Sequence, residues 1–226
     1  MAQRKIEILQ AARDLFAERG FEKTTMADIA VQVGVVESAL YRHYRSKQEL
    51  LVETIRAFYE PIIEDLERAE RTVDEPLPRV RCAVRRQLRV YAEDPKLCRL
   101  VLDAARRLEP QWAAEVAKLN RRYTAFVLRA VSDGVAGGAF RADIRPTLIR
   151  DLIYGWAEHI GWTVLTQGSS IDVDHLTAEV MAVLEPALTA RVDPAEQLRT
   201  EVDRLARLVE GAGAAFAGPS AGPGDV

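Results

Sequence analysis

The side chains best suited to binding chemistry gather between positions 25 and 47 of the 226-residue chain. Thr25 and Tyr41 carry hydroxyls, His43 an imidazole and Lys47 an ammonium group. Hydroxyls, ammonium groups and the N-termini of helices are the partners that hold phosphate oxygens in proteins. The types and spacing of these four residues therefore predict contact with a phosphate backbone.

Two short helices joined by a tight turn are expected to position these groups, at residues 27–33 and 36–41. Ala30 is small where the helices cross, Gly34 suits the turn, and the apolar residues between them form a shared core. This is the spacing of a helix-turn-helix. The second helix would leave four side chains free for the major groove: Val36, Glu37, Ser38 and Arg42. An ordinary helical hairpin has the same spacing, and the phosphate-binding groups on its flanks favour DNA.

Residues 4–52 resemble the N-terminal domain of the tetracycline-repressor (TetR) family. The motifs that carry the resemblance are Ile8-Leu9, Ala11-Ala12, Leu15-Phe16-Ala17-Glu18, Gly20-Phe21, Thr24-Thr25, Ile29-Ala30, Gly34-Val35, Leu40-Tyr41, His43-Tyr44 and Ser46-Lys47. The resemblance implies a homodimeric transcriptional regulator, usually a repressor, that a small ligand releases from its palindromic operator. It also implies phosphate contacts by Thr25, Tyr41, His43 and Lys47, and base contacts from the start of the second helix.

Two residues of the second helix depart from the pattern of the family. Val36 stands where a small polar residue is usual, and Ser38 where glycine is frequent. The Val36 methyls suit a thymine methyl, and the Glu37 carboxylate can accept from a cytosine amino group. Glu37 is equally well explained as a favourable charge at a helix N-terminus. The operator sequence is therefore not predicted.

The apolar residues recur at spacings of three and four almost throughout, which predicts an all-α fold. Capping-box patterns, Thr25 with Asp28 and Ser46 with Glu49, mark two helix starts. We expect a helix-turn-helix domain at 1–47, a helical ligand-binding and dimerisation domain at 48–192, a further helix at 193–210 and a disordered tail at 211–226. Pro61 is expected to kink the helix that begins at Lys47.

A ligand site is expected among four helices of the second domain, at 76–93, 95–108, 110–133 and 146–167. The expected contacts to a small hydrophobic effector are Arg85, Arg89, Leu100, Trp112, Tyr123, Phe126, Trp156 and His159. Apolar stripes of this kind are more often core, the arginines at 81, 85, 86 and 89 are by default a solvated face, and His159 is more typical of a core histidine. As an alternative, arginines at a pocket mouth suit a carboxylate or phosphate. The stretch Tyr123–Trp162 resembles TetR-family regulators of fatty-acid degradation, which implies an acyl-coenzyme A effector.

The helices at 146–167 and 172–190 carry apolar faces wider than one core contact needs. Six residues are predicted at a dimer interface: Ile153, Trp156, Ile160, Val180, Leu184 and Leu188. Gly155 and Gly161 would let helices approach closely. The alternative is that this surface is buried within one chain. In a dimer, two-fold symmetry would place two recognition helices about one turn of DNA apart.

Composition and motifs limit the other classes. The net charge is −3, yet residues 1–50 hold eight Lys/Arg against seven Asp/Glu, so any basic surface is local. We find no phosphate-binding loop, zinc-protease motif or nucleophile elbow, and expect no enzyme, cofactor or metal site. No run is long and apolar enough to span a membrane, and no signal peptide is recognisable, so a cytoplasmic location is expected. A DNA-binding regulator controlled by a protein partner, without a small effector, remains the alternative.

Overall fold

The computed structural model describes residues 2–189 and 202, and the side chains of 3–102, 108–189 and 202. Within these residues the chain is all-helical, as predicted, apart from one isolated β-bridge between Phe140 and Thr189. The helices are α1 (Ala2–Arg19), α2 (Met26–Val33), α3 (Glu37–Tyr41), α4 (Lys47–Thr72), α5 (Pro76–Glu93), α6 (Pro95–Arg107), α7 (Pro110–Ala136), α8 (Pro146–Gln167) and α9 (Val173–Leu188). The helix predicted at 193–210 and the tail at 211–226 lie outside the described residues, save for residue 202.

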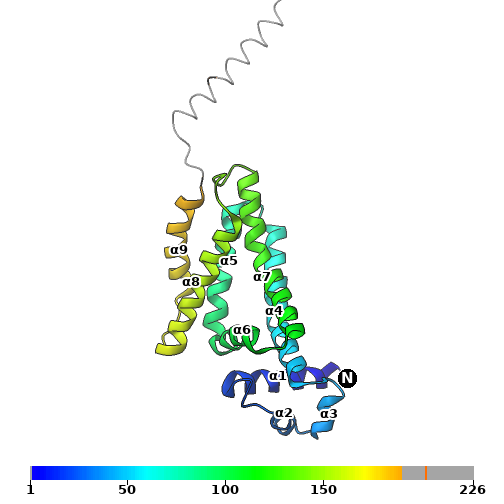
Figure 1. The fold of residues 1–226 in the computed structure, drawn as a ribbon. Helices are drawn as coiled ribbons and strands as arrows, with labels where there is room; N and C mark the ends of the chain where they lie inside the picture. Colours follow the sequence, from blue (N-terminus) through cyan, green and yellow to red (C-terminus); the bar gives the residue numbers. More distant parts are fainter. Residues whose placement is uncertain (1, 190–201, 203–226) are drawn as a thin grey trace, which may run out of the picture. The chain divides into compact units, whose positions relative to one another are not determined.

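The first three helices form the expected helix-turn-helix unit, seen at the lower end of Figure 1. Gly20 ends α1 at φ +80°, and the ring of Phe21 packs back on Phe16. Thr25 caps α2 in a complete capping box with Asp28. Gly34 then turns the chain at φ +73°, a left-handed conformation that glycine adopts without steric cost. These local signals place α3 directly after α2.

Helix α4 connects this unit to the rest of the chain. The Ser46 hydroxyl accepts from the Glu49 N–H, as the capping pattern predicts. The Glu49 carboxylate, however, accepts from the N–H of Arg45 rather than from that of Ser46, so the second half of the predicted box is displaced by one residue. The helix runs on through Pro61 to Thr72. Its beginning packs on α1 and the remainder on α7, so one element touches both regions.

The larger region is a bundle in which α4, α5, α7 and α8 surround a buried apolar core, with α9 packed on α5. Helix α6 lies across the lower end of the bundle, against α1 (Figure 1). Gly161 of α8 permits a close approach, because a Cβ there would clash with the ring of Tyr91 on α5. The close contact expected at Gly161 is thus made within the protomer.

Candidate nucleic-acid interface and effector cavity

The helix-turn-helix presents nearly all of the predicted DNA contacts to solvent. Val36 is 69% and Tyr41 49% exposed, which is unusual for large apolar and aromatic side chains. The remaining predicted contacts that are exposed are Thr25, Glu37, Ser38, Arg42 and His43. Val36 occupies the N-cap of α3 without a side-chain hydrogen bond, as its chemistry requires. The exposed row therefore fits a surface that a partner covers.

Lys47 is placed differently from the other predicted contacts. Its Nζ lies 2.9 Å from the carbonyl oxygen of Phe21 and 3.0 Å from that of Thr24, and it sits 4.2 Å from the centre of the Phe21 ring. The ammonium group thus ties the start of α4 to the loop before α2. Because an ammonium has three donors, one remains for a phosphate oxygen.

The Thr25 hydroxyl is likewise engaged within the chain. It donates to the Asp28 carboxylate over 2.6 Å and accepts from the Asp28 N–H over 3.1 Å. The Thr25 side-chain and backbone hydrogen bonds lower the pKa of Asp28, so this carboxylate stays charged at the cap. The hydroxyl thus holds the start of α2 in place. Its single proton is donated to Asp28, so in this arrangement it is not available to a phosphate oxygen.

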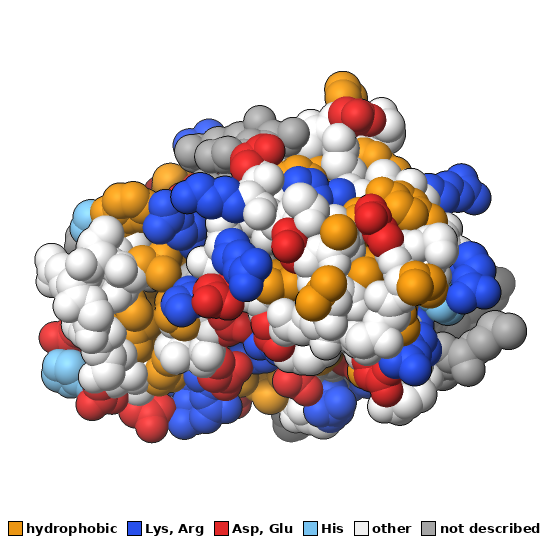
Figure 2. All heavy atoms as spheres, turned by 90° about the horizontal axis from the view of Figure 1, so that it is seen from below, with side chains coloured by type: hydrophobic (Ala, Val, Ile, Leu, Met, Phe, Trp, Pro, Cys, Tyr) orange, Lys and Arg blue, Asp and Glu red, His pale blue; other side chains and the backbone are white. Residues whose placement is uncertain are grey.

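Figure 2 shows the molecule from below, the side that carries the helix-turn-helix. Basic and acidic side chains are interspersed there, with hydrophobic side chains exposed between them. This agrees with the balance of eight basic and seven acidic residues in the first fifty. Binding to DNA through this face depends on the placement of particular side chains more than on bulk charge.

A cavity of about 410 Å³, here called the inner cavity, lies among α4, α5, α6, α7 and α8. Four tyrosines line it, namely Tyr59, Tyr91, Tyr123 and Tyr154, together with Gln87 and Asn120. Its volume falls in the range of small-molecule sites, about 300–1,000 Å³. Apolar ring faces with a few hydroxyls and amides can bind a largely apolar ligand and orient its polar group.

The tyrosine hydroxyls of the inner cavity differ in their partners. The Tyr123 hydroxyl donates to the Gln87 side-chain oxygen. The Tyr59 hydroxyl lies 3.5 Å from the side-chain oxygen of Asn120. The Tyr154 hydroxyl is buried without a well-formed hydrogen bond among the described residues, and its nearest polar neighbour is the hydroxyl of Tyr123. Burial raises the pKa of Tyr123 and Tyr154, so both stay neutral. Tyr154 thus offers a hydrogen-bonding group to a ligand.

Of the eight residues predicted to bind the effector, Tyr123 alone lines the inner cavity. Phe126 is core, Leu100 lines a different cavity against the end of α1, and Arg85 pairs with Asp174 at 2.8 Å. Arg89 and His159 are exposed, while Trp112 and Trp156 are half-buried. Tyr59, Gln87, Asn120 and Tyr154 line the inner cavity but were not among the predicted effector contacts. The sequence feature that could have indicated them is a side chain with a polar end on an otherwise apolar helix face.

The predicted dimer residues are divided between core and surface. Ile153, Leu184 and Leu188 are buried within the protomer, whereas Trp156, Ile160 and Val180 are half-buried. The same two helices expose other large apolar side chains: Leu148, Leu152, Trp162 and Val183. Gly155 faces open space, with no atom within 4 Å of the place a Cβ would take. An apolar surface therefore does exist on α8 and α9, beside the buried positions.

Comparison with known proteins agrees with this architecture. Residues 8–54 match the family model described as "Bacterial regulatory proteins, tetR family", and residues 73–161 match "Tetracyclin repressor-like, C-terminal domain". The chain therefore belongs to the TetR family of transcription regulators, which are not enzymes. Regulators of this family bind operator DNA and small effectors.

Relatives of known identity cover most of the chain. The "HTH-type transcriptional repressor KstR2" of Mycolicibacterium smegmatis is 26% identical over 193 residues, which is 83% of this chain and 92% of that protein. The fold resembles FadR of Bacillus subtilis in complex with stearoyl-CoA (TM-score 0.72, 18% identity, 80% of this chain and 98% of that one). It also resembles AibR in complex with isovaleryl coenzyme A and operator DNA (TM-score 0.68, 21% identity, 81% and 98%).

The described residues show neither a metal centre nor a membrane span. Among them, no three His, Cys, Asp or Glu side chains are grouped so as to hold a metal ion. None of the described helices is both long and apolar enough to cross a bilayer.

Proposed function

We propose that the chain is a homodimeric, ligand-responsive repressor, which acts in the cytoplasm on a palindromic operator. The exposed row on α3 and its flanks carries this proposal, because Val36, Tyr41 and Arg42 face solvent from a helix too short to need them for packing. Val36, Glu37, Ser38 and Arg42 would read base edges, while Tyr41, His43 and Lys47 would contact phosphates. Thr25 would join them once its hydroxyl proton turns from the Asp28 carboxylate to a phosphate oxygen. Residues 1–47 would act as the DNA head and 48–192 as the body.

Dimerisation through α8 and α9 is supported by the apolar surface described above. Leu152 and Trp162 are each more than half exposed, and Val183 is 70% exposed. Exposed apolar groups of this size on two adjoining helices are typical of an interface. With the open Gly155 between them, a second copy could approach α8 closely.

The inner cavity is the proposed effector site. Its rings and amides suit a mainly apolar compound, and the Tyr154 hydroxyl supplies a hydrogen bond to its polar group. Coenzyme A thioesters are the candidate class, since structures of similar fold hold stearoyl-CoA and isovaleryl coenzyme A. The effector must bind more tightly to the geometry that does not fit the operator. A coupling of about 1–3 kcal/mol changes operator affinity roughly 5–150-fold.

DNA binding is tested by fluorescence anisotropy on duplexes selected from a random library. We expect a palindromic duplex to bind, and Arg42→Ala to weaken it at least tenfold. Arg68→Gln, an exposed arginine of α4, is the matched control and should bind like wild type. Log affinity should fall linearly with log salt, because each phosphate contact releases counterions. Selection of no duplex, or affinity that ignores salt, would contradict the proposal.

The effector class is tested by thermal shift and operator release with coenzyme A thioesters of C4 to C18 acids. We expect stabilisation that depends on chain length, and release at the same concentrations. A response lost in Tyr154→Phe would assign the ligand to the inner cavity. A flat response to all chain lengths would reject this class, and a protein partner that removes the regulator from DNA would then be the better explanation.

A further inference from the structure

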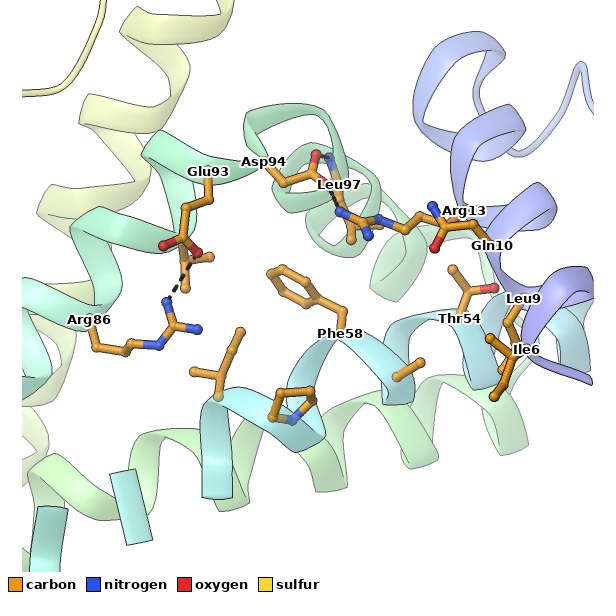
Figure 3. A pocket seen from close by; sticks show the side chains of 14 residues that line it. Ile6, Leu9, Gln10, Arg13, Thr54, Phe58, Arg86, Glu93, Asp94 and Leu97 are labelled. Atoms are coloured by element: carbon orange, nitrogen blue, oxygen red, sulfur yellow. Dashed lines mark hydrogen bonds and ion pairs between the residues drawn. The ribbon is translucent and has the colours of Figure 1, made fainter. Parts of the chain in front are cut away.

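A second cavity lies where the DNA head meets the body, and Figure 3 shows it from close by. This joint cavity has a volume of about 390 Å³. Ile6, Leu9 and Arg13 reach it from α1, Phe58 from α4, and Arg86 from α5. It therefore differs from the inner cavity in drawing part of its wall from the head.

Arg86 is incompletely satisfied in this cavity. Its guanidinium reaches Glu93 at 3.4 Å through one terminal nitrogen, while its Nε is buried and has no hydrogen-bond partner in the described chain. A buried donor without an acceptor destabilises the fold. The Nε edge of a guanidinium is the edge that binds a carboxylate through two parallel hydrogen bonds. Arg86 therefore keeps hydrogen-bonding capacity that an anion in the cavity can use.

The charges around the cavity limit how negative that anion can be. Arg13 also faces the cavity, but it is paired with Asp94 at 2.5 Å (Figure 3). Glu93 and Asp94 both line the wall, so two carboxylates balance the two arginines. A dianion such as a phosphate monoester would face like charges at close range. A single carboxylate carries half that charge, so it can pair with Arg86 at a smaller penalty.

Most of the remaining wall is apolar. Ile6, Leu9, Phe58, Pro61 and Ile62 line the cavity, and Gln10 and Thr54 are its uncharged polar members. Such a wall favours an alkyl or aryl body over water, because apolar surface is buried on binding. Phe58 and Ile62 also line the inner cavity, so these side chains separate the two spaces.

We propose that the joint cavity binds an amphipathic monocarboxylate, such as a medium-chain fatty acid, with its carboxylate on Arg86 and its apolar body against Leu9 and Phe58. A molecule bound there touches α1 of the head and both α4 and α5 of the body. It thereby fixes the head relative to the body, so its binding is coupled to operator affinity. The site is separate from the effector site proposed above.

Isothermal titration calorimetry of the full chain with sodium octanoate tests this site. We expect saturable binding by wild type, at least tenfold weaker binding by Arg86→Gln, and no binding by Ala57→Trp. Ala57 lines the cavity from an exposed position, so the larger side chain fills the space without disturbing the core. Arg68→Gln, an arginine away from the cavity, is the matched control and should bind like wild type.

Two further measurements separate this site from the inner cavity. 1-Octanol, which lacks the carboxylate, should bind wild type at least tenfold more weakly than octanoate does. Asn120→Leu alters the wall of the inner cavity and should leave octanoate binding unchanged. Loss of binding in Asn120→Leu with retention in Ala57→Trp would overturn the inference yet leave the proposed effector site standing. No binding by wild type at 10 mM octanoate, or equal binding by Arg86→Gln, would also overturn it.

Discussion

Tyr123 and Tyr154 line one cavity, and their rings lie 5.3 Å apart, yet their hydroxyls do different things. The Tyr123 hydroxyl donates to a buried glutamine, whereas that of Tyr154 is buried without a well-formed hydrogen bond in the described part of the chain. A satisfied buried hydrogen bond stabilises the fold, and an unsatisfied buried group destabilises it. The first hydroxyl therefore serves structure, and the second is available to a ligand.

Replacing each tyrosine by phenylalanine separates these roles. Tyr123→Phe should lower the free energy of unfolding by about 1–3 kcal/mol, because it leaves the buried Gln87 side-chain oxygen without its hydrogen-bond donor. Tyr154→Phe should leave stability unchanged or raise it slightly, since it removes a buried hydroxyl without a well-formed hydrogen bond. Urea denaturation of both variants measures the difference. A larger loss in Tyr154→Phe than in Tyr123→Phe would show that the Tyr154 hydroxyl is paired.

Cys98 gives a prediction for alkaline pH. Burial raises the pKa of this thiol to about 12, and the charge of Asp94 raises it further in the same direction. The thiol ionises near pH 9 once unfolded, so its contribution to stability is complete below pH 9 and is lost as the pH rises toward 12. Urea denaturation between pH 8 and 11 should show a shallower decline in Cys98→Ser than in wild type. Equal slopes would contradict burial of the thiol.

At the scale of elements, helix boundaries were well predicted because local chemistry sets them. The α8 bounds match the prediction, and α4 and α7 begin where Ser46 and Pro110 indicate. Glu49 shows the limit of such patterns. Its carboxylate accepts from the N–H of Arg45, whereas the capping-box pattern predicts the N–H of Ser46. The inner cavity was largely missed, because Tyr59, Gln87 and Tyr154 come from three helices. Which helices face one another is decided by packing, which one-dimensional spacing does not encode.

Helix α4 is the element that links the head to the body, and Pro61 lies within it. Proline lacks the N–H that would pair with the Ala57 carbonyl, which weakens the helix there by up to about 3 kcal/mol. Pro61→Ala restores that hydrogen bond and stiffens α4. We expect operator affinity without effector to stay within twofold of wild type, and the effector concentration for half-release to shift at least fivefold. The reverse pattern, measured by anisotropy, would show that α4 does not transmit the signal.

At the scale of the whole molecule, the proposed dimer explains how a slightly acidic chain can bind DNA. The net charge of −3 rules out indiscriminate coating of nucleic acid. Each helix-turn-helix head of the proposed dimer would make few contacts to DNA. Specific binding to the operator therefore requires that both heads bind the same operator. A change in the spacing of two heads then has a large effect on binding, which suits regulation by a ligand.

The dimer surface is tested by placing a charge on it. Leu152 is 51% exposed on α8, so Leu152→Glu should fold normally yet sediment as a monomer. Val31→Glu introduces the same charge at an 80% exposed position on α2 and should remain dimeric. Analytical ultracentrifugation distinguishes the two. A dimeric Leu152→Glu would place the interface elsewhere.

The walls of the two cavities differ in a way that matters for engineering. The inner cavity takes its lining from α4 to α8 and none from α1 to α3, whereas the joint cavity takes four residues from α1. Under the proposed function, a library of substitutions around Tyr59, Asn120 and Tyr154 would change which compound is sensed and leave the DNA-contacting residues unaltered. A biosensor built on this chain should be diversified there, and its dynamic range tuned separately at Leu9, Ala57 and Arg86.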